Sequence, residues 1–154
     1  FDARLARVVT NYDAGLILNH MRGTPETWAK LPPMKDVISG IGGDLEASVH
    51  RAVRTGVERA RIVIDPGVGF GKRGEQNSEI LARLPELAKL ELPILVGPSR
   101  KLFLRRPTER ETQFATAAAV TAAILGGAHM VRVHDVPEMR AAAAIADAIL
   151  RTLT

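Results

Sequence analysis

The segment at the centre of this chain reads Arg61-Ile-Val-Ile-Asp65-Pro-Gly-Val-Gly-Phe70-Gly-Lys-Arg-Gly-Glu75-Gln-Asn77. Its apolar residues 62–64 are typical of a buried strand, and they lead directly to the carboxylate of Asp65, after which Pro66 ends the strand. Glycine occupies four of the eight positions 67–74, which lets the backbone approach a ligand closely. The segment predicts a binding site at the end of a strand, and a plain turn with a capping Asp is the alternative.

Three kinds of nucleotide-binding loop can be compared with this segment. A Walker A loop needs four residues between its first Gly and its Gly-Lys pair, whereas three residues separate Gly67 from Gly71, and Arg rather than Ser or Thr follows the Lys. The range 69–74 fits G-x-G-x-x-G, but the acid that dinucleotide-binding folds place after the next strand is missing. A kinase loop needs a following strand, and the pattern here predicts a helix. None of these motifs explains the glycines.

The composition is that of an ordinary globular protein. The 154 residues, of which 46% are apolar, are enough for one domain, which we expect to span 1–154. No apolar run reaches the roughly 18 residues of a membrane span, no secretory leader is recognisable, and there is no cysteine. We therefore expect no membrane partner and a cytoplasmic location. The first residue is Phe rather than Met, so the chain reads as if it began inside a domain.

The net charge of +4 is spread over the chain rather than clustered. Aromatic residues make up only 4% of the sequence, which is too few for a base-stacking platform, so we expect no nucleic-acid partner. A small anionic substrate fits this charge better, although a surface that is merely rich in Arg would explain it as well.

Hydrophobic spacing predicts helices that alternate with four short strands. The predicted helices lie near 1–9, 44–58, 77–87, 112–125 and 136–153, and the predicted strands near 15–21, 62–65, 93–97 and 130–135. This alternation favours right-handed βαβ units and a parallel sheet, so the predicted fold class is α/β. A (β/α)8 TIM barrel needs eight such units, and this chain shows about four.

Particular residues are predicted to bound the helices. Asp44, Asn77 and Asp135 stand at expected amino-terminal caps, the last of them in a capping box with Glu138. Residues 28–43 are then a long loop. Pro85 is expected to divide the third helix, and the pair of glycines at 126–127 to end the fourth. The expected core faces include Leu5, Val8 and Val9 at the start of the chain and, in the last helix, Met139, Ala142, Ala146, Ile149, Leu150 and Leu153.

Polar residues follow each predicted strand, at the edge where barrel enzymes build their active sites. They are Asn19 and His20, Asp65, the run 99–101, and Arg132 with His134. Because residues i and i+2 of a strand share a face, Arg132 and His134 are predicted to line one cavity. Lys and Arg at such positions suit an anion, and a carboxylate can accept paired hydrogen bonds from an amidine-like heterocycle edge.

Plainer interpretations stand beside these. His20 is more often a satisfied core histidine than a ligand, and Arg100 at a loop tip is as readily a surface residue in a salt bridge. The histidines lack the spacing of a metal motif, so no metal ligand is predicted in this chain, and Ser99 has no evident triad partner.

Four motifs together resemble the dihydropteroate synthases of folate biosynthesis, in that family's order and spacing and over nearly the whole chain. They are Asn19-His-Met-Arg-Gly-Thr-Pro25, Asp65-Pro-Gly-Val-Gly-Phe-Gly-Lys72 with Gln76-Asn77, Leu95-Val-Gly-Pro-Ser-Arg-Lys101, and Gly127-Ala-His-Met-Val-Arg-Val-His-Asp-Val136. The resemblance implies a (β/α)8 barrel of which this chain is the C-terminal half. It also implies a reaction that joins 6-hydroxymethyl-7,8-dihydropterin pyrophosphate to p-aminobenzoate, giving 7,8-dihydropteroate and pyrophosphate.

The same resemblance implies roles for individual residues. By similarity the catalytic residues are Asp65, Lys101, Arg132 and His134. The pterin would contact Met21, Asp65, Gly97, Lys101 and Arg132; p-aminobenzoate, with which sulfonamides would compete, would contact Phe70, Ser99 and Lys101; and pyrophosphate would contact Arg132, Val133 and His134.

The resemblance further implies a Mg²⁺ ion, whose ligand is expected in the family's N-terminal half, and a homodimer. The chain departs from the family pattern at Val68, where an aromatic residue is usual, at Asn19, where Met is common, and at the variable position Pro98.

Two other hypotheses stay open. A methyltetrahydrofolate-binding module of a methyltransferase would share the barrel, but such a ligand has no pyrophosphate for the Ser-Arg-Lys and Arg-Val-His motifs to hold. A non-catalytic or engineered half-barrel would leave strand edges and the barrel interior uncovered, and we would expect it to self-associate.

Overall fold

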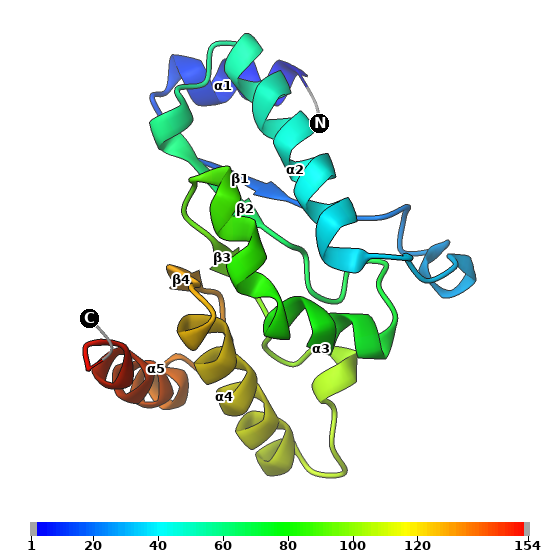
Figure 1. Ribbon diagram of the computed structural model, residues 1–154, viewed down its shortest axis with the longest axis vertical. Helices are drawn as coiled ribbons and strands as arrows, with labels where there is room; N and C mark the ends of the chain where they lie inside the picture. The colour runs from blue at the N-terminus through cyan, green and yellow to red at the C-terminus, as the bar shows by residue number, and fades with distance from the viewer. Residues whose placement is uncertain (1–2, 153–154) are drawn as a thin grey trace.

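The computed structural model describes residues 3–152, which contain four short strands that run parallel in chain order (Figure 1). β1 (Leu16–Asn19) pairs with β2 (Ile62–Asp65) along its whole length, and β3 (Leu95–Val96) pairs with β4 (Met130–Val131). A single bridge between Ile64 and Ile94 connects the two pairs. The predicted parallel arrangement is therefore confirmed, with shorter strands than the sequence suggested.

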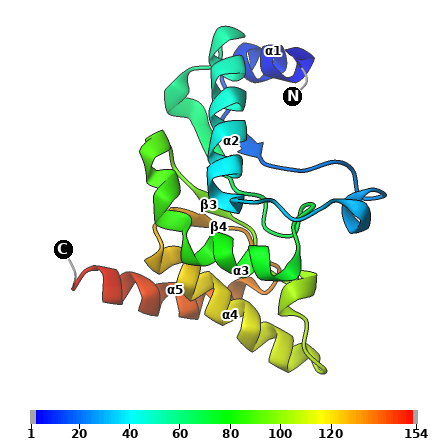
Figure 2. The same cartoon turned by 45° about the vertical axis from the view of Figure 1, so that its right-hand side comes forward.

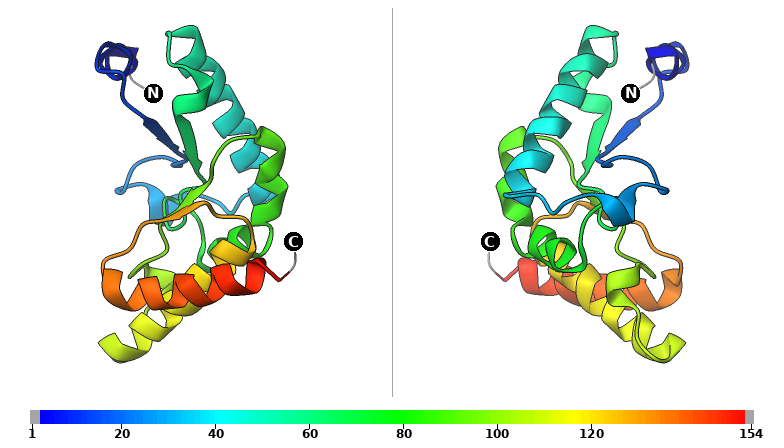
Figure 3. Two further views of the ribbon diagram at one scale, coloured as in Figure 1. Left: turned by 90° about the vertical axis from the view of Figure 1, so that its left-hand side faces the viewer. Right: turned by 90° about the vertical axis from the view of Figure 1, so that its right-hand side faces the viewer.

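Helices connect each strand to the next. α1 (Ala3–Asn11) precedes β1, and α2 (Val37–Arg54) leads from β1 to β2. α3 (Gly74–Ala82) and the 3₁₀ helix Leu84–Leu90 lead to β3. α4 (Glu109–Leu125) leads to β4, and α5 (Val136–Leu150) follows. Figures 1 and 2 show α1 and α5 at opposite ends of the molecule, and in Figure 3 α2 and the 3₁₀ helix lie on the same side of the strands.

The main core lies between the strands and the helices that cover them. Alternation on β1 shows this directly: Leu16 and Leu18 are buried, whereas Ile17 between them is 52% exposed. Side chains of successive strand residues point to opposite faces, so the helix-covered face is dry and the other face of β1 is open. α2 supplies the largest share of the helical side of this core, through Val37, Ile38, Ile41, Leu45, Val49 and Ala52.

α2 begins seven residues before the predicted start. The cap is Asp36, whose carboxylate accepts a hydrogen bond from the Ser39 backbone N–H at 3.1 Å, and not Asp44. The first turn also buries Val37 and Ile38 against the core, which offsets the cost of placing glycines inside a helix. The predicted loop 28–43 is therefore shorter than expected.

The predicted cap at Asn77 is also wrong, because α3 begins at Gly74 and Asn77 lies inside it. The Asn77 amide instead holds the glycine loop, since its oxygen accepts a hydrogen bond from the Gly69 N–H at 2.6 Å and its nitrogen donates to the Arg73 carbonyl at 2.8 Å. Pro85 does divide the helical segment, since α3 ends at Ala82 and the 3₁₀ helix Leu84–Leu90 follows.

The fourth unit differs from prediction at three points. α4 begins at Glu109, ahead of the expected Thr112, because Thr108 and Glu111 form a capping box. β4 ends at Val131 rather than at residue 135, because the His134 N–H turns to the Ser99 hydroxyl. Asp135 precedes α5 but makes no capping hydrogen bond. Gly126 closes α4 as predicted.

The end helices bury fewer residues than the spacing suggested. In α1, Leu5 and Val8 are about half exposed, and the buried residues are Ala6 and Val9. In α5, Met139 and Ala146 are buried and Ala142 and Leu150 partly buried, whereas Ile149 is 42% exposed. Phe1 and Leu153, which were predicted on these helices, lie outside the described residues. None of the helices within 3–152 is both long and apolar enough to cross a membrane.

The capping box of α4 predicts a measurable loss of stability. Thr108→Ala removes the side-chain acceptor for the Glu111 N–H, so we expect the free energy of unfolding to fall by about 1 kcal/mol in urea titrations. Thr121→Ala, in the interior of the same helix, is the matched control and should leave stability unchanged or slightly raised, because Ala is the better helix former. Equal losses for both variants would contradict the capping assignment.

Candidate active site

The carboxyl ends of the strands meet through direct hydrogen bonds. The His20 N–H, just after β1, donates to the Asp65 carbonyl at 2.9 Å, and the Arg132 N–H, just after β4, donates to the Val96 carbonyl at 3.0 Å. The polar residues that the sequence places after each strand are therefore gathered at one edge of the sheet, as predicted.

Asp65 is the most deeply buried of these residues, at 2% exposure. Its Oδ1 accepts a hydrogen bond from the Gly67 N–H at 2.7 Å, which fixes the carboxylate against its own turn. No side chain or N–H within 3–152 donates to its other oxygen, Oδ2. An unpaired carboxylate oxygen on a residue as buried as Asp65 can receive a hydrogen bond from a ligand or water.

Lys101 lies across the glycine loop from Asp65. Its Nζ sits 3.8 Å from the centre of the Phe70 ring, a cation–π contact, and Trp28 meets the same ring edge-on at 5.7 Å. Burial lowers the pKa of Lys101 and the charge of Arg132 lowers it further, while the charge of Asp65 raises it. The ammonium is thus within electrostatic reach of both Asp65 and Arg132.

Arg132 lies over Gly97, the residue that follows β3. A Cβ at Gly97 would come within 2.7 Å of the Arg132 Nη2 atom, so glycine is needed for the guanidinium to take this position. Among the described residues, no carboxylate or carbonyl accepts a hydrogen bond from the Arg132 guanidinium. The guanidinium is therefore free to bind an anion through two parallel hydrogen bonds, that is, bidentately.

Ser99 and His134 form a pair that the sequence did not predict. The Ser99 side chain is 5% exposed; its Oγ accepts from the His134 N–H at 3.2 Å and lies 2.9 Å from the His134 Nδ1 atom. The Ser99 hydroxyl can accept the hydrogen bond from the N–H and at the same time donate its own proton to Nδ1. In that arrangement the imidazole carries its proton on Nε2, which is free to donate to a ligand. Val133 packs instead with the apolar cluster between α4 and α5, whereas Arg132 and His134 are exposed. That these two side chains line one cavity stays a prediction.

The remaining predicted residues stand further from the centre. Met21, after β1, is 51% exposed. Arg100 adopts a left-handed backbone conformation, with φ of 56°, and is ion-paired with Asp135 at 2.6 Å and Glu109 at 3.5 Å. The salt-bridge interpretation of Arg100 is therefore correct, and it explains why Asp135 does not cap α5.

Lys72 is the functional residue that sequence reasoning missed. Its Nζ donates to three backbone carbonyls: His20 at 3.0 Å, Pro66 at 2.9 Å and Gly67 at 2.6 Å. Burial lowers the pKa of Lys72 to about 7, against the opposing charge of Asp65. One feature of the sequence could have indicated a role for Lys72. It is a single lysine inside a glycine loop that follows a buried acid, and a lysine in solvent would have no evident role there.

His20 is buried, as a core histidine should be, but it is only half satisfied. Its Nε2 lies 3.1 Å from the Asp44 carboxylate, while its Nδ1 and the Trp28 Nε1 have no hydrogen-bond partner within the described chain. Burial, together with the charge of Lys72, lowers the pKa of His20 to about 4. His20 is therefore neutral at pH 7.

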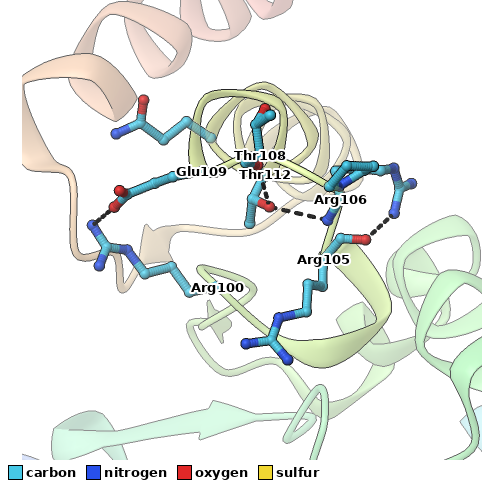
Figure 4. A pocket seen from close by; sticks show the side chains of 8 residues that line it. Arg100, Arg105, Arg106, Thr108, Glu109 and Thr112 are labelled. Carbon is cyan, nitrogen blue, oxygen red and sulfur yellow. Dashed lines mark hydrogen bonds and ion pairs between the residues drawn. The ribbon is translucent and has the colours of Figure 1, made fainter.

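Two cavities border the site. One of about 430 Å³ opens between the glycine loop and Lys101, with Trp28, Asn77 and Phe103 in its walls. The other, of about 330 Å³, is shown in Figure 4; its walls are the loop 105–108 and the start of α4, and Arg100 reaches it from the strand side. None of the predicted ligand contacts lines this second cavity.

Metal ligation finds no support in the side chains. Residues 3–152 contain no group of three or more His, Cys, Asp or Glu side chains that could hold a metal ion.

The turn after Asp65 should not accept a side chain at Gly67. Its φ is 67°, and a Cβ there would collide with the His20 carbonyl oxygen and approach the Lys72 Nζ to 2.9 Å. We expect Gly67→Ala to lower the free energy of unfolding by at least about 2 kcal/mol in urea titrations. Gly43→Ala, in α2 with no atom within 4 Å of its Cβ, should instead raise stability by about 0.5–1 kcal/mol. A tolerated Gly67→Ala would refute the packed turn.

Protonation of His20 should destabilise the fold in acid. A pKa of 6.5 when unfolded and about 4 when folded means that the unfolded state binds the proton first. Stability should therefore rise between pH 4 and 6.5, by about 3 kcal/mol from this group. His20→Gln should lose that increment in urea titrations across the range, and His50→Gln, on an exposed histidine, should keep it. Identical pH profiles for wild type and His20→Gln would contradict the assignment.

The sequence and the fold are both similar to known proteins. The family model described as "Pterin binding enzyme" matches residues 1–134. A dihydropteroate synthase from Synechocystis sp. is 41% identical over 98% of this chain and 54% of its own length. The dihydropteroate synthase of Thermus thermophilus, solved in complex with 4-aminobenzoate, superposes with a TM-score of 0.88 at 32% identity, over 97% of this chain and 62% of that one.

The same Thermus enzyme in complex with 6HMPPP gives a TM-score of 0.86 at 33% identity, over 97% of this chain and 61% of that one. The chain spans about half the length of the curated relatives it matches. The structural matches confirm the predicted fold class: the four parallel βα units are part of a (β/α)8 barrel. The chain belongs to the pterin-binding enzyme family.

Proposed function

We propose that this chain carries the C-terminal half of a dihydropteroate synthase active site. The reaction condenses 6-hydroxymethyl-7,8-dihydropterin pyrophosphate with p-aminobenzoate to 7,8-dihydropteroate and pyrophosphate. One observation carries the proposal: Asp65 is buried with one oxygen held and the other unpaired, and Lys101 lies within electrostatic reach of both Asp65 and Arg132. A ligand with a donor-rich ring and an anionic tail matches that arrangement of charge.

The pterin ring is the part of the substrate that suits Asp65. A ring N–H and an exocyclic amine side by side can both donate to one carboxylate, and Oδ2 has no competing donor in the described chain. Gly97 provides a surface without a side chain beside the Arg132 guanidinium, and Met21 supplies an exposed, flexible apolar side chain. These three residues form the proposed pterin slot.

The pyrophosphate group suits the other side of the site. Arg132 offers an unpaired guanidinium, Lys101 a partly buried ammonium, and His134 a ring nitrogen that Ser99 leaves free. The backbone of Val133 lies between the first and the last of these, so we assign pyrophosphate to the turn 132–134. Phosphate oxygens favour such a mixture of a forked and a point-charge donor.

p-Aminobenzoate is assigned to the glycine-loop side. The Phe70 ring offers an aromatic surface next to the Lys101 ammonium, and the 430 Å³ cavity borders Lys101. The Ser99 hydroxyl makes two hydrogen bonds to His134. Its second lone pair stays available, so Ser99 can also accept a hydrogen bond from p-aminobenzoate.

The chemistry follows from the placement of these charges. The bond between the pterin methylene carbon and the pyrophosphate oxygen breaks, and both electrons leave with pyrophosphate. Asp65 stabilises the positive charge that develops on the pterin, while Lys101 and Arg132 stabilise the leaving anion. The aniline nitrogen then bonds to the methylene carbon and releases its proton to water or to the pyrophosphate. An aniline nitrogen is nucleophilic when neutral, so no strong base is needed.

We extend the proposal to the features that the family resemblance implies. Residues 1–154 form one pterin-binding domain of a cytoplasmic enzyme, without membrane or nucleic-acid partners. Apolar side chains exposed on α4 and α5, such as Phe114 at 62% and Ile145 at 64%, support a homodimer through these helices. Residues 3–152 contain no group of three or more His, Cys, Asp or Glu side chains that could hold a metal ion, so no step is assigned to Mg²⁺, and the expectation that its ligand lies outside this sequence stays a prediction.

A second candidate is a non-catalytic pterin-binding half-barrel. Turnover separates the two candidates. We expect the 154 residues alone to show no turnover. A chimera in which they replace the matching part of the Synechocystis enzyme should catalyse the condensation, and an inactive but folded chimera would favour the second candidate.

Loss of the Asp65 charge should weaken pterin binding specifically. We expect Asp65→Asn, which keeps the shape of the side chain, to bind 6-hydroxymethyl-7,8-dihydropterin pyrophosphate about 100-fold more weakly than wild type in titration calorimetry of the chimera. Asp147→Asn, on the exposed side of α5, is the matched control and should bind as wild type does. Equal affinity for wild type and Asp65→Asn would refute the site.

A further inference from the structure

Lys72 connects the ends of two strands through a single ammonium group. The His20 carbonyl belongs to the segment after β1, and the Pro66 and Gly67 carbonyls belong to the turn after β2, 2.6–3.0 Å from Nζ. An ammonium has three protons, and here each has a carbonyl acceptor. The group therefore ties two segments that lie 46 positions apart (20 and 66) in the chain.

The segments that Lys72 ties together are the ones that present Asp65. The Gly67 N–H that holds the Asp65 carboxylate belongs to the same residue whose carbonyl accepts from Lys72. On the other side, His20 N–H donates to the Asp65 carbonyl at 2.9 Å. Asp65 is thus held through its side chain and its main chain by two groups that Lys72 fastens to each other.

The contact between these segments is close enough to transmit a change at Lys72. Gly67 has no room for a Cβ, because the His20 carbonyl and the Lys72 Nζ lie against it. A Cβ at Gly71 would likewise approach the Arg22 carbonyl to 2.5 Å. Segments packed this tightly have few alternative positions, so moving one of them moves the Asp65 carboxylate.

The fold itself gains little from this charge. Burial lowers the pKa of Lys72 to about 7; the charges of Asp65 and Asp44 oppose that shift, and those of Arg22 and Lys101 reinforce it. His20, which is neutral at pH 7, adds no charge. Because an ammonium is costly to bury, its net contribution to the stability of the fold is smaller than its three hydrogen bonds suggest.

We propose that Lys72 is a positioning residue of the pterin slot: its ammonium fastens the segment after β1 to the turn after β2 and thereby fixes the orientation of the Asp65 carboxylate. The inference rests on the proposed function for the identity of the ligand, but not for the contacts themselves. Lys72 does not act on the substrate directly, because all three of its protons are bound to backbone.

The absence of cysteine from the sequence permits a test that changes only the charge. Lys72→Cys can be alkylated in urea with 2-bromoethylamine, which rebuilds a lysine-like ammonium, or with 2-bromoethanol, which adds a neutral hydroxyl of similar length. Each product is refolded beside wild-type chain taken through the same treatment. Lys72→Met supplies a form that needs no alkylation, and Lys35→Met, on an exposed lysine, is its matched control.

Three quantities are measured at pH 5.5, well below the Lys72 pKa of about 7, so that the ammonium is protonated: exchange of the Gly67 amide by NMR, affinity for 6-hydroxymethyl-7,8-dihydropterin pyrophosphate, and the thermal midpoint. We expect the neutral forms to exchange Gly67 about tenfold faster and to bind about tenfold more weakly. Their thermal midpoints should stay within about 5 °C of wild type. The aminoethylated form should return both exchange and affinity to within about twofold of wild type.

Other outcomes overturn the proposal in distinguishable ways. Neutral forms that match wild type in Gly67 exchange and in affinity would mean that the ammonium positions nothing. Neutral forms that do not fold, with folding restored by aminoethylation, would assign Lys72 to the stability of the fold. If wild type binds no pterin, the proposed function fails, and the exchange of the Gly67 amide still decides the role of Lys72.

Discussion

A carboxylate buried at the end of a strand is the constraint around which this structure is arranged. Asp65 is 2% exposed, and a charge at that depth must be met by donors or by opposite charge. The chain provides one donor from the Gly67 N–H, and it places Lys72 and Lys101 within electrostatic reach. Glycine at position 67 is required by the packing of this turn, because its φ is 67° and a Cβ there would collide with the His20 carbonyl oxygen.

Proximity and burial, more than the lack of an ion pair, distinguish the cations of the site. Arg83 is held by Asp36, Glu79 and Glu86, and Arg100 by Asp135 and Glu109. Arg132 and Lys101 have no carboxylate partner within hydrogen-bonding distance in the described chain, but exposed residues such as Lys35 share that property. Burial lowers the pKa of Lys101 and the nearby charge of Arg132 lowers it further, so two cations close together at one sheet edge suit an anionic ligand.

The sequence predicted the strands, their direction and the residues at their ends, because those depend on local hydrophobic spacing and on one strong rule of barrel folds. It did not predict where helices begin. Asp36 and Asp44 are equally good caps by residue type, and the burial of Val37 and Ile38 decides between them. The predicted caps Asn77 and Asp135 were wrong for another reason. Each side chain has a partner in another segment, Gly69 and Arg100 respectively, that the local sequence does not reveal.

The residues that sequence reasoning missed are those whose role lies in contacts between segments. Lys72 resembles any lysine in a loop until its three carbonyl acceptors are seen, and Ser99 has no apparent partner until His134 is brought beside it. Both hold another group in place: Lys72 the turn behind Asp65, and Ser99 the ring of His134. Residue type and spacing therefore identify groups with their own chemistry, whereas the groups that orient them become visible only when two strand ends are placed side by side.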